Sequence, residues 1–369
     1  MQGVTELDHR CSTTVHTHAS ALSLQYPASH NPLLRLPIPL ISSKALLYFI
    51  MAEPLVLDPA LPSKVLHQFP FPTWIENIAV RSNGDLLLTL LTTPELYLIR
   101  PSNPGGPVLV HKFDEVSALT GIIEIKEDVF YVGGGNFTLQ PWSSGADTYQ
   151  VFEVDLTSFD KDSKPKVKKI AYLPGCGLAN GFELLSREDG TVLIADSDAG
   201  VVWKLNVNEG TVEKLIDVEE MKPPPPPSIP MGINGIKIRD GYLYWSNTGQ
   251  QFFCRIKIDD EGKTSGSVEV LEREIIVDDF VFDRKGNAWV TCHTVNTLGV
   301  VKAAGGVIIA GGSIDKLTLA GGTACQFGRT SLDADVLYFV TSGGMAAPVN
   351  GAEVEGGKVV AIDTAKFSH

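Results

Sequence analysis

The stretch MGINGIKIRDGYLYWSNTG, residues 231–249, decides the fold because its pattern recurs along the chain. An oxygen-bearing side chain, here Asn234, is followed by an alternating apolar strand, a polar turn and a second apolar strand. Such alternation is typical of half-buried β-strands joined in hairpins. Three further copies carry Glu76, Asn180 and Asp278 at the same point: TWIENIAVRSNGDLLLT (73–89), GLANGFELLSREDGTVLIADS (177–197) and VDDFVFDRKGNAWVT (277–291).

Two weaker copies lack the oxygen ligand and are centred on Gly121 and Thr323. With them, the markers are spaced by 45, 59, 54, 44 and 45 residues. Six repeats of about 40–50 residues indicate a β-propeller, in which each repeat forms a four-stranded blade. The sequence therefore predicts an all-β, six-bladed β-propeller. The last repeat lacks one strand, and KVLHQF (64–69) is the free candidate, so we expect an N-terminal strand to close the ring.

The first 50 residues contain no copy of the repeat and hold four of the eight histidines of the chain. We expect residues 1–50 to be a disordered extension and residues 51–369 to form the single propeller domain. The apolar run ALLYFIM (45–51) is much shorter than a membrane span, so no membrane-spanning segment is expected.

The composition narrows the partners and the compartment. The net charge is -13, and no basic stripe interrupts it, which argues against a nucleic-acid partner. The five cysteines are odd in number, scattered and without a CxxC pair, which favours free thiols in a reducing, cytoplasmic setting.

The innermost strand of each blade lines the central channel of a propeller, and its first residues point into the mouth. Glu76, Asn180, Asn234 and Asp278 all occupy that position. Two carboxylates and two amide oxygens make a hard site that suits Ca²⁺ or another divalent cation. The alternative is that these are strand-entry residues that bond only to backbone groups.

The same residues resemble the ligand pattern of the SMP-30/gluconolactonase-like six-bladed propellers, over about residues 61–365. In that family a divalent metal lies at the axis and an Asp at the position of Asp278 acts as the base in lactone hydrolysis. Two departures stand out: Asn77 follows Glu76 where the family usually has a Gly-Pro turn, and Asp279 follows Asp278 where it usually has Gly.

A closer resemblance is to a fungal branch of such propellers. The segments that carry it are FPTWIENIAVRSNGDLLLT, LPGCGLANGFEL, MGINGIKIRDGYLYWSNTGQQFF, TACQFGRT and SGGMAAPVNGAEVEGGKVVAID. Members of this branch belong to secondary-metabolite pathways, and some resemble hetero-Diels-Alderases of tropolone sesquiterpenoid biosynthesis. The resemblance implies a cyclase that joins a tropolone quinone-methide-like polyketide diene to a terpene alkene.

A pocket with apolar walls and a few polar anchors suits a hydrophobic substrate better than a sugar acid. Glu76, Asp278 and His293 are the candidate catalytic residues, although His293 is also open to a reading without any role. Cyclisation requires no cofactor, because a cycloaddition needs no nucleophile. The expected substrate-binding residues are Asn180, Asn234, Phe137, Phe252, Gln326 and Phe327.

Two alternatives stay open at this point. One is a divalent-metal-dependent lactonase, in which a cation polarises the lactone carbonyl and Asp278 activates water. The other is a non-catalytic ligand-binding propeller, because this fold hosts many roles.

Overall fold

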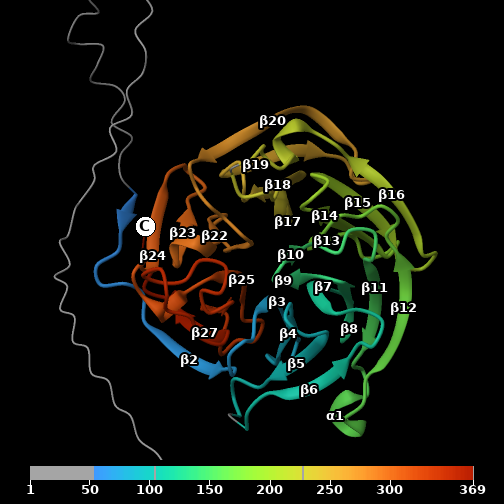
Figure 1. The fold of residues 1–369 in the computed structure, drawn as a ribbon, viewed down its shortest axis with the longest axis horizontal. Helices are drawn as coiled ribbons and strands as arrows, with labels where there is room; N and C mark the ends of the chain where they lie inside the picture. Colours follow the sequence, from blue (N-terminus) through green and yellow to red (C-terminus); the bar gives the residue numbers. More distant parts are fainter. Residues whose placement is uncertain (1–53, 104, 227, 369) are drawn as a thin grey trace, which may run out of the picture. The chain divides into compact units, whose positions relative to one another are not determined.

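Six antiparallel sheets stand around a common axis in the computed structural model, which describes residues 54–369 except 104, 227 and 369 (Figure 1). The expected extension over residues 1–50 lies outside this range. The predicted six-bladed, all-β propeller is confirmed.

Each blade runs outward from the axis through four strands. Blade one has β3 (Ile75–Val80), β4 (Leu86–Leu90), β5 (Glu95–Ile99) and β6 (Val108–Lys112). Blade two has β7 (Ala118–Lys126), β8 (Val129–Gly135), β11 (Gln150–Asp155) and β12 (Lys166–Tyr172). Blade three has β13 (Ala179–Ser186), β14 (Thr191–Asp196), β15 (Val201–Asn206) and β16 (Thr211–Ile216).

The remaining blades follow the same order. Blade four has β17 (Ile233–Arg239), β18 (Tyr242–Asn247), β19 (Phe252–Ile258) and β20 (Thr264–Arg273). Blade five has β21 (Phe280–Phe282), β22 (Ala288–Cys292), β23 (Thr297–Val301) and β24 (Val307–Gly312). Blade six has β25 (Gly322–Phe327), β26 (Val336–Thr341), β27 (Lys358–Asp363) and, outermost, β2 (Ser63–Gln68).

The strand β2 pairs antiparallel with β27, with Val65 opposite Val360. The first and last described parts of the ring thus share one sheet. A second N-terminal strand, β1 (Leu55–Val56), pairs parallel with β24 and adds a fifth strand to blade five. The strand β1 was not predicted, because a strand of two residues is too short to show alternation in the sequence.

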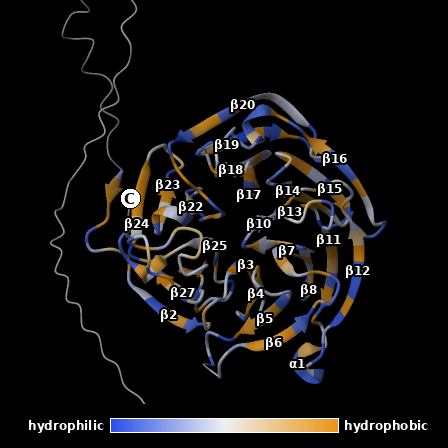
Figure 2. Ribbon diagram, in the orientation of Figure 1, coloured by the Kyte–Doolittle hydropathy of each residue, from blue (hydrophilic) through white to orange (hydrophobic). Residues whose placement is uncertain are grey.

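Strand alternation places side chains in two different cores. On β18, Leu243 and Trp245 pack in the core between blades three and four, whereas Tyr244 packs in the core toward blade five. Successive side chains of a strand point to opposite faces, so a sheet covered on both faces needs apolar residues at consecutive positions. Figure 2 shows this apolar character along the blades.

The inner strands β3, β7, β13, β17, β21 and β25 contact one another in that order and close on β3 again. Between β8 and β11, blade two carries a small hairpin, β9 (Thr138–Leu139) with β10 (Trp142–Ser143), which lies toward the centre of the ring (Figure 1). Short helices complete the fold: α1 (Phe159–Asp162), η1 (Glu219–Met221), η2 (His293–Val295) and η3 (Leu317–Leu319).

The four described cysteines, Cys176, Cys254, Cys292 and Cys325, are buried and unpaired. No helix in the described part of the chain is long and apolar enough to cross a membrane.

Candidate functional site

The four oxygen-bearing residues of the repeat occupy equivalent places at the start of the inner strands. Glu76, Asn180 and Asn234 are each the second residue of their strand, and Asp278 lies two residues before β21. All four are buried, with exposed fractions between 1% and 8%. The Asn234 amide Nδ2 donates a hydrogen bond to Asp278 Oδ1 at 2.7 Å, which joins blades four and five at the mouth.

Glycine follows two of these residues because the inner strands approach one another closely. A Cβ on Gly181 would lie 2.4 Å from the carbonyl oxygen of Asn234, and one on Gly235 would lie 2.3 Å from Asp279 Oδ1. No side chain tolerates such contacts, so the Asn-Gly pairs of the repeat are required by the packing of the axis.

Blade six offers no free oxygen ligand at the mouth because the Thr323 hydroxyl is already hydrogen-bonded to the backbone. Thr323 Oγ1 donates to the carbonyl oxygen of Ile75 at 2.7 Å and so ties blade six to blade one. In blade two, Gly121 packs directly against the backbone of Asn180. These two blades therefore contribute walls to the mouth and no acidic group.

A chain of three polar side chains runs through Asp278. Asp278 Oδ2 lies 2.6 Å from His293 Nδ1, and His293 Nε2 lies 3.1 Å from Ser342 Oγ. Both ring nitrogens of His293 thus have protein partners, and the ring is fixed. His293 reaches the mouth through its contact with Asp278, and its catalytic role stays a prediction. Ser342, which follows β26, had no signal in the sequence beyond its place before two glycines.

Glu76 is bound differently. Its Oε2 accepts a hydrogen bond from the Trp74 indole Nε1 at 2.6 Å, and the Trp74 ring lies 5.0 Å from the His293 ring. Its other oxygen, Oε1, has no hydrogen-bond partner among the described residues. Glu76 and Asp278 are therefore linked through two aromatic side chains, Trp74 and His293.

Burial and the nearby charges shift the pKa of both carboxyl groups. Burial, together with the negative charge of Asp278, raises the pKa of Glu76 well above its ordinary range. Burial also raises the pKa of Asp278, but hydrogen bonds from His293 and Asn234 oppose that shift. Both shifts favour the protonated form; two donors oppose the shift at Asp278, whereas only the Trp74 indole opposes it at Glu76.

A second polar layer lies below the mouth and contains both departures from the family pattern. Asn77 Nδ2 donates to Asp279 Oδ2 at 3.3 Å, and Lys237 Nζ lies 3.2 Å from Asp279 Oδ1. Asp279 occupies the space that the missing side chain of Gly235 leaves free. Asn77 and Asp279, the two departures from the family pattern, are thus hydrogen-bonded to one another. They lie 202 residues apart, so the sequence does not reveal this pairing.

The structure brings some of the remaining predicted residues to the mouth and not others. Phe137 is buried in the same apolar cluster as Trp74. Phe252 begins β19, the third strand of blade four, and stacks against Arg273 at 4.6 Å on the outer side of the blade. It therefore lies two strands, about 10 Å, outward of the innermost strand β17.

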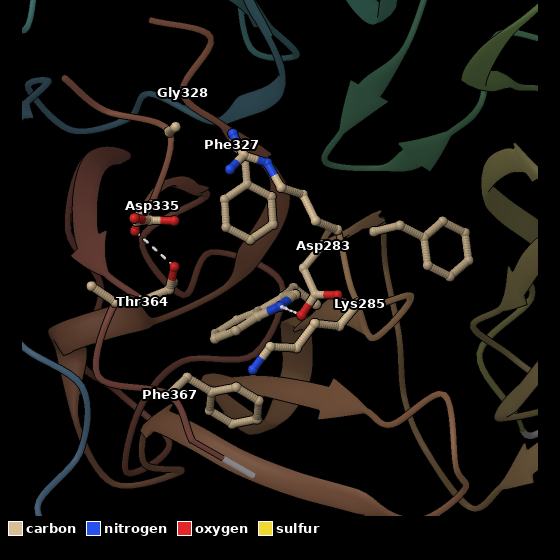
Figure 3. Close-up of a pocket in the computed structure, with 12 residues that line it drawn as sticks. Asp283, Lys285, Phe327, Gly328, Asp335, Thr364 and Phe367 are labelled. Carbon is tan, nitrogen blue, oxygen red and sulfur yellow. Dashed lines mark hydrogen bonds between the residues drawn. The ribbon is translucent and has the colours of Figure 1, made fainter. Parts of the chain in front are cut away.

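Gln326 and Phe327 lie at the other end of β25 from the mouth. Four residues separate Thr323 from Phe327, a rise of about 13 Å. Phe327 faces Trp289 at 5.9 Å and lines a cavity of about 360 Å³ with Phe367 and Lys285 (Figure 3). The structure does not bring these two residues to the axial cluster.

The axial cluster of Glu76, Asn180, Asn234 and Asp278 offers fewer free oxygen atoms than a calcium ion takes. Calcium takes six to eight oxygen ligands. Both oxygens of Asp278 face nitrogen donors, and one oxygen of Glu76 faces an indole N–H. Three acceptors of the cluster have no partner within the described part of the chain: Asn234 Oδ1, Asn180 Oδ1 and Glu76 Oε1. Across the described ranges, no three His, Cys, Asp or Glu side chains gather as a metal centre needs. A bound cation therefore stays a prediction.

Two curated fungal proteins are similar to this chain over most of their length. One, of Phoma sp, is named "Putative hetero-Diels-Alderase"; it is 32% identical over 75% of this chain and 86% of its own. The other, of Sarocladium schorii, is named "Putative hetero-Diels-Alderase asR5"; it is 31% identical over 84% of this chain and 85% of its own. No family model matches the chain.

Solved structures extend the likeness at the level of fold. The calcium-binding protein regucalcin of Agrobacterium tumefaciens superimposes with a TM-score of 0.58 at 15% identity, over 85% of this chain and 96% of its own. A protein described as a "putative gluconolactonase" superimposes with a TM-score of 0.55 at 15% identity, over 83% of this chain and 94% of its own. Both resemblances expected from the sequence are thus confirmed.

Proposed function

The chain belongs to the family of the two fungal proteins that carry the hetero-Diels-Alderase name, and on that premise we propose that it is a cyclase of secondary metabolism. The proposed reaction joins a tropolone quinone-methide-like diene to a terpene alkene. The observation that carries the proposal is the pair of buried carboxyl groups, Glu76 and Asp278, at a mouth walled by apolar side chains.

Glu76 is proposed as the general acid. Its raised pKa favours the protonated form, so its free Oε1 would protonate a leaving hydroxyl group of the diene precursor, the C–O bond would break and water would depart. Trp74 holds the other oxygen and thereby fixes the direction of the proton.

Asp278 is proposed as the matching base. A carboxylate has about four acceptor sites, so Asp278 keeps capacity beyond its bonds to His293 and Asn234. It would take the proton of a ring hydroxyl as that oxygen becomes the carbonyl of the quinone methide. One proton leaves Glu76 and one arrives at Asp278, so the site stays balanced overall.

Asn180 is proposed to bind the new carbonyl oxygen. Its side chain makes no hydrogen bond within the described part of the protein, so its amide N–H is available as a donor. The Nδ2 of Asn234 is already bound to Asp278 and to Thr248. A hydrogen bond to the carbonyl oxygen lowers the energy of the lowest unoccupied orbital of the heterodiene. It therefore favours attack by an electron-rich alkene.

The ring closure itself needs no group that bonds to the substrate. Two bonds form together while the diene and the alkene are held within reach. Positioning of this kind recovers about 7–11 kcal/mol of a bimolecular barrier in favourable cases. No step of this scheme is routed through a metal.

The test is a coupled assay with a hydroxymethyl tropolone precursor and a terpene alkene. Glu76→Gln should lower kcat by about 100-fold or more, because general acid catalysis contributes about 10² to 10⁴. Asp278→Asn should retain more activity, because water is able to take the ring-hydroxyl proton in place of Asp278, whereas Glu76 is the acid proposed for the leaving hydroxyl group. Glu188→Gln, a change on the exposed surface, is the matched control.

A metal arm separates this proposal from a lactonase. Chelator should leave the cyclisation rate unchanged. Rapid hydrolysis of simple aldonolactones that disappears with chelator and returns with Ca²⁺ would overturn the proposal. Absence of turnover with either substrate class, together with tight binding of one of them, would point to a binding propeller.

A further inference from the structure

Three loops from different blades deliver apolar side chains to one cluster at the mouth. Leu139 comes from β9 and Met345 from the turn after β26. Met231 lies at the end of the proline-rich loop that joins η1 to β17. All three pack against the buried cluster that contains Trp74, Phe137 and residues of blades two and three. The three side chains come from loops of blades two, three and six and pack on one apolar cluster.

The β9–β10 hairpin is held at its base by side-chain hydrogen bonds. Ser117 Oγ donates to the carbonyl oxygen of Phe137 at 3.2 Å, and the Tyr149 hydroxyl donates to that of Ser144 at 2.7 Å. The Phe137 and Trp142 rings meet edge to face at 4.8 Å. The hairpin extends toward the centre of the ring (Figure 1). Its base is fixed and its tip is joined by one short pair of strands.

The proline-rich loop is fixed by side chains of blade four. Asn247 Nδ2 donates to the carbonyl oxygens of Glu220 and Lys222, both at 2.9 Å, and Gln250 Nε2 donates to Lys222 at 2.8 Å. Gly249 leaves room for the loop, because a Cβ there would lie 2.3 Å from the Met231 carbonyl oxygen. The position of Met231 is therefore imposed by blade four.

Met345 is linked to the catalytic pair through the chain itself. It follows Gly343 and Gly344, which have φ of 70° and 80°, and these follow Ser342, the partner of His293. Such φ values favour glycine and allow the sharp reversal that aims Met345 at the cluster. Met345 and Ser342, the partner of His293, thus belong to one turn.

Leu139, Met231 and Met345 pack on the cluster that contains Trp74. Trp74 in turn donates to Glu76 and contacts His293. Glu76 is 8%, Asp278 7% and His293 7% exposed, so a substrate reaches them only when something above them moves. Leucine and methionine are well suited to contact a hydrocarbon, and methionine adapts its shape to irregular apolar surfaces.

We propose that Leu139, Met231 and Met345 form the subsite for the hydrocarbon part of the substrate, and that the β9–β10 hairpin opens to admit it. This assignment rests on the proposed function for the identity of the hydrocarbon as an alkene. The subsite itself requires only an apolar ligand of suitable size.

The first experiment measures access to His293 in the full-length protein and needs no substrate. Diethyl pyrocarbonate modifies accessible histidines, and His67 and His111 serve as internal references because both are partly exposed. In a variant whose residues 139–142 are replaced by Gly-Gly, modification of His293 relative to His111 should rise by about tenfold or more. The paired residues Thr138 and Ser143 lie opposite one another, so two glycines span the gap.

An unchanged ratio in a shortened variant that keeps the wild-type melting temperature would overturn the covering role of the hairpin. If that variant does not fold, Leu139→Gln provides the same measurement with a smaller change. Ile314→Gln, a substitution at a side chain that is 64% exposed, is the matched control and should leave the ratio unchanged.

The second experiment measures the subsite with N-phenyl-1-naphthylamine, a neutral apolar dye whose fluorescence rises on burial. Met231→Gln and Met345→Gln should each weaken dye binding by about tenfold, the scale of a lost apolar contact in a pocket. The same variants should raise KM for the alkene and leave KM for the tropolone precursor within about twofold. Dye affinity equal to wild type in both variants would overturn the subsite.

These outcomes separate the two proposals. If Glu76→Gln turns over normally while dye binding still depends on Met231, the proposed reaction falls and the apolar subsite stands. If Glu76→Gln is inactive while dye binding is indifferent to Met231 and Met345, the reaction stands and the subsite falls.

Discussion

Glu183 is a carboxyl group that the fold holds in an unfavourable setting for a charge. It lies on β13, and its Oε1 accepts a hydrogen bond from the backbone N–H of Ile238 at 3.3 Å. Burial raises its pKa from 4.5 to about 7, although Lys237 opposes the shift. A carboxyl group that binds its proton more tightly in the folded protein stabilises the fold below its unfolded pKa. That stability is lost as the pH rises through the folded pKa.

We therefore expect Glu183→Gln to flatten the dependence of stability on pH between 4.5 and about 7. Over this window the free energy of unfolding of the wild type should fall relative to that of the variant. Urea unfolding at several pH values measures the slope. Glu188→Gln, on the exposed turn after β13, should keep the wild-type slope, and an identical slope in Glu183→Gln would refute the expectation.

At the scale of elements, hydroxyl groups on second strands join neighbouring blades. Thr89 on β4 donates to the carbonyl oxygen of Thr120, Ser246 on β18 to that of Asp278, and Thr291 on β22 to that of Thr323, at 2.6, 2.6 and 3.0 Å. Each bond reaches the inner strand of the next blade. The position of Asp278 is thus set partly by blade four.

Ser246→Ala should destabilise the protein by about 1 kcal/mol, the net value of a typical hydrogen bond. The loss stays modest because the Asp278 carbonyl oxygen also accepts from the Gly235 N–H at 3.1 Å. Equilibrium unfolding in urea gives the difference. Thr264→Ala, on the exposed edge strand β20, is the control, and a loss no greater than in that control would contradict the inter-blade role.

These inter-blade bonds also mark the limit of sequence reasoning about the site. The repeat pattern predicts Glu76, Asn180, Asn234 and Asp278 because it is periodic, and a period is visible in a chain without coordinates. Ser342 and Lys237 carry no such period. Their partners, His293 and Asp279, are 49 and 42 residues away, and only the ring brings them together.

At the scale of the whole molecule, the ring depends on a strand from its N-terminal side. Alongside the pairing of β2 with β27, Leu61 is buried in the core of blades five and six and Phe69 in that of blades six and one. An open ring would expose the edge of β27 and both of these cores.

Three truncations test this arrangement. A chain that starts at residue 54 keeps both N-terminal strands, one that starts at residue 61 loses only β1, and one that starts at residue 70 also loses β2. We expect a small loss of stability for the second and a loss above about 4 kcal/mol for the third, since burying Leu and Phe side chains contributes about 2–5 kcal/mol each. Equal melting temperatures for the three chains would exclude closure through β2.

The sequence by itself determined the fold, the register of the four axial residues and the blade from which each comes. It did so because strand alternation and a repeat of about 45 residues are local and survive in one dimension. Only the tertiary structure decided what these residues do to one another. It placed His293 and Ser342 behind Asp278, paired Asn77 with Asp279 and sent Gln326 and Phe327 to the far end of the channel. Those contacts depend on the angle and spacing between blades, which no single repeat contains.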